Sequence, residues 1–97
     1  MTTPNAAAIA LHQRIVAIAA RVAPEVATAY EAESDPTAAA DAARDAIDDA
    51  AAARRGDLRA ALKELSLTVV FGDVWAGAPL RSTVARIDAL DARIGAA

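Results

Sequence analysis

Apolar residues recur along most of the chain at intervals of three and four, which places them on one face of an α-helix. Thr3-Pro4 is typical of a helix start, because a hydroxyl side chain caps the N-terminus and proline fits the first turn. We predict a first helix over 4–33, kinked or broken at Pro24, since proline lacks the N–H that a helix interior needs. Its main apolar stripe comprises Leu11, Ile15, Ile18 and Val22.

The same spacing, with its start and stop signals, predicts three more helices, over 36–55, 58–71 and 79–94. Asp35 and Asp57 are placed to cap the first two of these, and Gly56 fits a left-handed turn between them. Residues 66–71 also have β propensity, so a short strand is the alternative there. We prefer helix because the apolar spacing continues through that stretch.

Alanine dominates the composition, with 30 of 97 residues, and it accounts for more than half of the 56% of hydrophobic positions. Alanine has the highest helix propensity, and its small side chain lets two helix backbones approach closely. A chain of this length forms one domain. The sequence therefore predicts a single all-α domain over 1–97, a small antiparallel bundle of about four Ala-rich helices.

Charge and residue usage exclude several classes of function. The net charge is −3, which disfavours nucleic acid or an anionic membrane as a partner. No cysteine is present, and no apolar run reaches the ~20 residues of a membrane span. The sequence has one histidine and no metal-binding, phosphate-binding or nucleophile motif, so we expect no enzyme activity, cofactor or metal. Without a signal sequence, we expect a cytoplasmic protein or part of a virion assembled there.

The large apolar side chains exceed what one small helical core needs, which favours a surface for a protein partner. The first helix carries a second apolar stripe, with His12 at its seam as either a structural residue or a titrating interface group. Asp91 has a core-like position in the last helix, where a partner arginine could meet it. The residues that we expect at the interface are Ile9, His12, Val16, Leu67, Phe71, Trp75 and Asp91.

We therefore interpret the chain as a non-enzymatic interaction or assembly subunit that self-associates or docks a larger partner. A phage or virion structural component is one form of this function. The alternative is a small DNA-binding regulator, because the spacing of small and apolar residues over 52–65 partly matches a helix-turn-helix. Its DNA contacts would be Arg54, Arg55, Arg59 and Lys63, although the helix before them is acidic.

Overall fold

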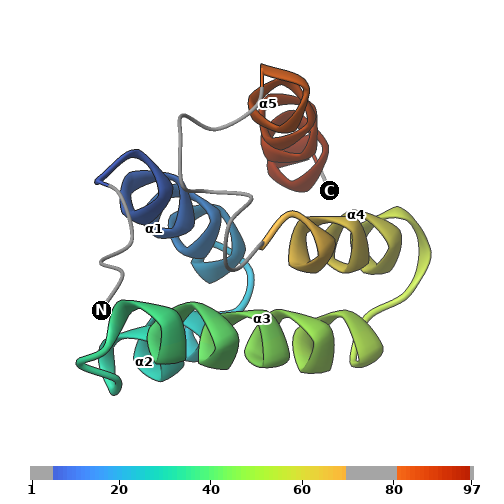
Figure 1. The fold of residues 1–97 in the computed structure, drawn as a ribbon. Helices are drawn as coiled ribbons and strands as arrows, with labels where there is room; N and C mark the ends of the chain where they lie inside the picture. The colour runs from blue at the N-terminus through green and yellow to red at the C-terminus, as the bar shows by residue number, and fades with distance from the viewer. Residues whose placement is uncertain (1–5, 70–80, 97) are drawn as a thin grey trace.

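The computed structural model describes residues 6–69 and 81–96, and this part of the chain forms five α-helices and no strand (Figure 1). The helices are α1 (Ala6–Ala20), α2 (Glu25–Glu31), α3 (Pro36–Ala52), α4 (Gly56–Leu67) and α5 (Arg81–Ala96). The predicted all-α class is confirmed. The described helices number five instead of four, because the segment predicted as one kinked helix divides into α1 and α2.

The division lies at Pro24, where the sequence predicts a kink or break. The backbone N–H of Arg21 bonds the carbonyl of Ile18, three residues earlier, so the last turn of α1 tightens before the chain leaves the helix. Pro24 has helical dihedral angles and begins the next helical turn as the N-cap of α2. Its missing N–H costs nothing at that position.

The turn regions around α3 agree with the sequence in part. The carboxylate of Asp35 accepts a 2.9 Å hydrogen bond from the backbone N–H of Ala38, as a helix cap should. Gly56 has a φ of +64°, the left-handed conformation expected of it. The expectation that Asp57 caps α4 is wrong, because α4 begins at Gly56 and its N-cap is Arg55, which makes no side-chain capping bond.

Helix α4 ends at Leu67, four residues before the predicted end at 71. The hydroxyl of Thr68 donates a 2.6 Å hydrogen bond to the carbonyl of Leu65, and the backbone N–H of Thr68 bonds the same carbonyl. A β-branched residue with such a local bond competes with helix continuation. The predicted helical residues 70–71 and 79–80 lie outside the described part of the chain.

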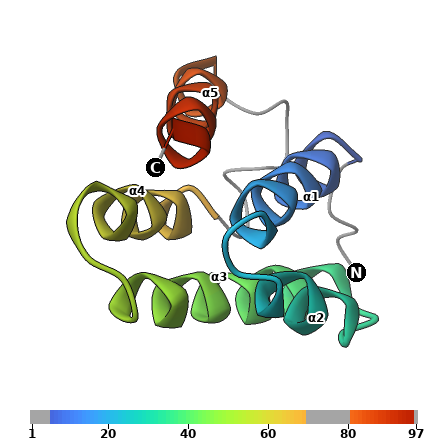
Figure 2. The same ribbon diagram turned by 180° about the vertical axis from the view of Figure 1, so that it is seen from behind.

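The helices form layers, with α2 and α3 on one side, α1 and α4 in the middle and α5 on the opposite side (Figures 1 and 2). Helices α3 and α4 lie next to each other and run in opposite directions. Helix α5 is foreshortened in the view that shows α3 lengthwise, so the helices do not share one axis. The regular four-helix antiparallel bundle is therefore not confirmed.

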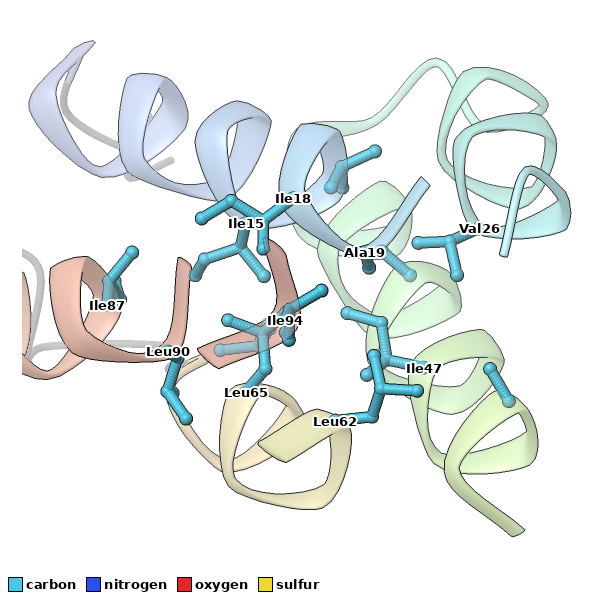
Figure 3. Close-up of a cluster of buried hydrophobic side chains, with 14 of the residues drawn as sticks. Ile15, Ile18, Ala19, Val26, Ile47, Leu62, Leu65, Ile87, Leu90 and Ile94 are labelled. Atoms are coloured by element: carbon cyan, nitrogen blue, oxygen red, sulfur yellow. The ribbon is translucent and has the colours of Figure 1, made fainter. Parts of the chain in front are cut away.

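Buried aliphatic side chains from every layer meet in one cluster (Figure 3). Its largest fully buried members include Ile15 of α1, Ile47 of α3, Leu62 of α4 and Leu90 of α5. Alanines complete the cluster, namely Ala8, Ala19, Ala23, Ala40, Ala43, Ala50, Ala51 and Ala61. The core therefore combines a few large side chains with many small ones, as the composition predicts.

Candidate interaction surface

The second apolar stripe of α1 is largely covered within the chain. His12 is 8% exposed and Val16 is 7% exposed, while Ile9 is half-buried. In this fold, these three side chains therefore offer little surface to a partner. Phe71 and Trp75, the two aromatic residues expected at the interface, lie outside the described residues.

Leu67 at the end of α4 has the opposite environment. It is 65% exposed, and among the described residues it is the one large apolar side chain that faces solvent. Ala60, seven residues earlier, lies on the same side of α4 and is also exposed. Leu67 is therefore the predicted interface residue that the fold places in solvent.

Helix α5 carries a row of small residues on its solvent side. The exposed alanines of this row are Ala85, Ala89, Ala92 and Ala96. Their spacing of four, three and four residues keeps them on one face, opposite the buried Ile87, Leu90 and Ile94. A solvent-facing helix side usually carries charged residues, so this face is unusually apolar.

An ion-pair seam around Arg93 connects α5, which carries the alanine row, to α4, which carries Leu67 and Ala60. Arg93 of α5 donates hydrogen bonds of 2.8 Å to the carboxylates of Asp57 and Glu64, both on α4. The hydrogen bond from Arg93 holds the pKa of Asp57 below its ordinary value, and the same bond raises the pKa of Arg93. The exposed Leu67 and Ala60 of α4, together with the alanine row of α5, are called the α4–α5 face below.

Asp91 lies on the other flank of α5, where arginines of the same chain meet it. Its carboxylate pairs with Arg21 and lies 3.6 Å from the guanidinium of Arg14. Arg14 also forms a 2.5 Å ion pair with Asp88, one turn earlier on α5. These pairs connect α1 to α5, so the arginine expected from a partner is supplied by the fold itself.

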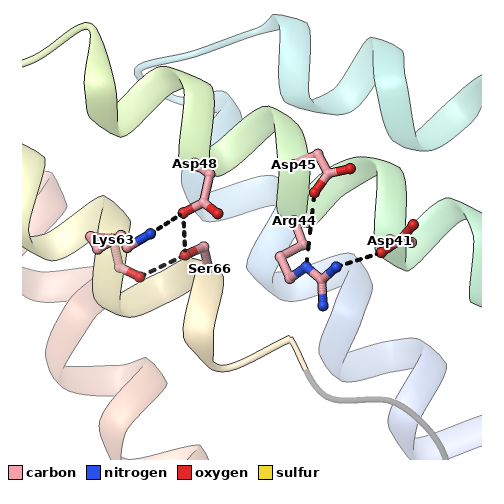
Figure 4. Close-up of polar contacts among 6 residues, drawn as sticks. All are labelled: Asp41, Arg44, Asp45, Asp48, Lys63 and Ser66. Carbon is pink, nitrogen blue, oxygen red and sulfur yellow. Dashed lines mark hydrogen bonds and ion pairs between the residues drawn. The ribbon is translucent and has the colours of Figure 1, made fainter.

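The outer side of α3 is acidic (Figure 4). Asp41, Asp45 and Asp49 are exposed at intervals of four, and Arg44 pairs with Asp41 at 2.7 Å and with Asp45 at 4.0 Å. No helix of the described chain covers this side, because the buried residues of α3 lie on the opposite face. Most of these carboxylates therefore face solvent.

Asp48, on the edge of α3 next to α4, belongs to a separate polar contact (Figure 4). Its carboxylate lies 3.0 Å from the ammonium of Lys63 and accepts a 2.9 Å hydrogen bond from the hydroxyl of Ser66. The hydrogen bond from Lys63 is the largest cause of the lowered pKa of Asp48. This contact fixes α3 against α4.

The four basic residues considered for DNA binding fall into two groups. Arg54 donates hydrogen bonds to the backbone carbonyls of Ala50 and Val22, and Lys63 pairs with Asp48. Arg55 and Arg59 are exposed. Two of the four thus already hold the fold together.

The sequence prediction missed the alanine row of α5 and the Arg93 seam. The signal for the row is present in the sequence, since the four alanines alternate with the apolar residues of α5 at helical spacing. Among residues 6–69 and 81–96, no three His, Cys, Asp or Glu side chains are placed to hold a metal ion. No helix in those ranges is long and apolar enough to cross a membrane. Comparisons with protein-family models, curated proteins and solved structures found no match to this chain.

Proposed function

We propose that this chain is a non-enzymatic interaction or assembly subunit that docks a protein, either a second copy or a larger partner, through the α4–α5 face. The observation that carries the proposal is the exposure of Leu67 on α4, together with the exposed alanine row on α5, the helix that Arg93 pairs with α4. An apolar surface rimmed by charged residues is typical of a protein-docking site. Here the rim consists of Arg81, Arg86 and Asp88.

The chemistry of the charged residues also supports an interaction role. Arg93, Asp91 and Asp48 each pair with an oppositely charged side chain of a neighbouring helix. These pairs hold helices together, and a group used in this way is poorly placed to transfer protons to a substrate. The charged residues of the fold thus support a scaffold function.

The experiment places a photo-crosslinking amino acid at position 67 of the full chain, in the cells that make the protein. We expect one discrete adduct, which disappears when Ala89→Arg is added to the same chain. The matched control carries the crosslinker at the exposed Glu31 of α2. If no adduct forms at position 67 and the purified chain sediments as a monomer at ~1 mM, the proposed function is wrong.

A further inference from the structure

The two outer layers of the fold differ in the sign of their net charge. Residues 25–52, which contain α2 and α3, have eight acidic side chains and one arginine, a net charge of −7. Residues 81–96, which contain α5, have three arginines and two aspartates, a net charge of +1. The net charge of −3 for the whole chain is therefore distributed unevenly, with a strongly negative layer on one side and a slightly positive layer on the other.

The two outer faces point in opposite directions. Helices α3 and α5 lie on opposite sides of the molecule, with α1 and α4 between them (Figures 1 and 2). The buried residues of α3 and α5 face this middle layer, so their exposed faces point outward. On α3 that face carries Asp41, Asp45 and Asp49, with the exposed Ala52.

The outer face of α5 complements that of α3 in charge. Arg81 and Arg86 flank the alanine row of α5 on its two sides, and both are exposed. Asp88 lies on the same rim, where its charge is paired with Arg14 of α1. The alanine row of α5 permits a close approach of a second helix. Complementary charges also steer the encounter and suppress contacts between like faces.

We propose that the occupant of the α5 face is the acidic α3 face of a second copy of this chain. This inference rests on the proposed function and names its partner. Two different faces on opposite sides of one molecule make a heterologous, head-to-tail contact, which leaves a free face at each end. The product is an open stack of copies that grows with concentration.

Salt is the first test. Exposed charges more than about 3 Å apart are screened at 1 M ionic strength, against about 30 Å at 0.01 M. In sedimentation velocity at 10 mM salt, we expect the average mass to rise with concentration without levelling off at the dimer, and to fall to the monomer at 1 M salt. A plateau at the dimer, or a mass independent of salt, overturns the inference.

Charge reversal is the second test, and it uses two variants of the full chain. Arg81→Glu with Arg86→Glu makes both outer faces acidic, and Asp45→Arg with Asp49→Arg makes both basic. We expect each variant alone to associate at least about tenfold more weakly than the parent, because like charges then face each other. An equimolar mixture should regain association, since each variant then finds a face of opposite charge.

The control is Glu31→Arg with Glu33→Arg, which reverses two exposed acidic residues away from the outer face of α3. It has the same net charge as Asp45→Arg with Asp49→Arg, so a general charge effect would change both equally. We expect the control to associate like the parent. If the α3 variant also does so, or if the mixture stays monomeric, the inference is wrong. The crosslink at position 67 tests the proposed function independently of these results.

Discussion

Arg54, in the turn between α3 and α4, donates a 2.6 Å hydrogen bond to the backbone carbonyl of Val22, 32 residues earlier in the chain. Its other nitrogen bonds the carbonyl of Ala50 at the end of α3, at 3.0 Å. The same guanidinium therefore caps α3 and holds the chain where it leaves α1. A positive charge at a helix C-terminus also interacts favourably with the helix dipole.

We expect Arg54→Met to lower the free energy of unfolding by about 1–3 kcal/mol, because a hydrogen bond from a charged group is lost. Arg55→Met removes the same charge from an exposed neighbour and is the matched control. Urea unfolding followed by circular dichroism measures both. Equal midpoints for the two variants would mean that the bond to Val22 contributes nothing to stability.

The small residues of α3 give a second prediction. Ala43 is fully buried, while Ala53 at the end of α3 is exposed. We expect Ala43→Leu to destabilise the fold by about 1–3 kcal/mol, because the core has no space for the added methyl groups. Ala53→Leu should be tolerated, and helix propensity cannot explain such a difference, since leucine and alanine are both good helix formers. Thermal melts of the two variants at one concentration test this, and equal melting temperatures would contradict it.

Acid should weaken the contact between α4 and α5. A carboxyl group whose pKa is lower in the folded than in the unfolded state stabilises the fold above its unfolded-state pKa, about 3.9 for aspartate. That contribution is lost as the pH falls through the folded-state pKa. Because Arg93 lowers the pKa of Asp57, Arg93→Gln should cost stability at pH 7 and cost progressively less below about pH 4.

Urea unfolding of the parent and the Arg93→Gln variant at a series of pH values measures this difference. Arg86→Gln is the matched control, because it removes an exposed arginine from the same helix. A cost of Arg93→Gln that stays constant down to pH 2 would show that the effect comes from the aliphatic part of the arginine.

We predict no specific binding to duplex DNA. The outer face of α3 is acidic, and Arg54 and Lys63 already bond within the chain. Fluorescence anisotropy of labelled duplexes at low salt measures the affinity. A salt-sensitive complex at low micromolar protein, lost in the double variant Arg55→Ala with Arg59→Ala, would contradict the prediction.

Local signals in the sequence predict the structure where the cause is local. Pro24 ends α1 because its own backbone lacks a donor, and Asp35 caps α3 through a residue three positions away. The buried stripe of Leu11, Ile15 and Ile18 follows from helical spacing alone. Each of these effects acts within about one turn, so the sequence reveals it.

The remaining features depend on residues far apart in the chain. Asp57 has the sequence of a helix cap, but its carboxylate bonds Arg93, 36 residues later. In the sequence, Val16 lies on a second apolar stripe, which predicts an outward-facing side chain, but it is buried. Periodicity shows on which side of a helix a residue lies, and does not show which neighbouring helices cover that side. The α4–α5 face arises from helix packing, which spacing along the chain does not specify.

Arg21 and Asp91, which form an ion pair, are 70 positions apart in the sequence, whereas Lys63 and Asp48 are 15 positions apart. Closing a long loop costs more chain entropy than closing a short one, so contacts distant in sequence form late in folding. We therefore expect α5 to dock after α3 and α4 have paired, on the product side of the folding barrier. In stopped-flow measurements, Asp91→Asn should speed unfolding and leave the refolding rate nearly unchanged. The lifetime of the native state would then depend on how often α5 detaches from the rest of the fold.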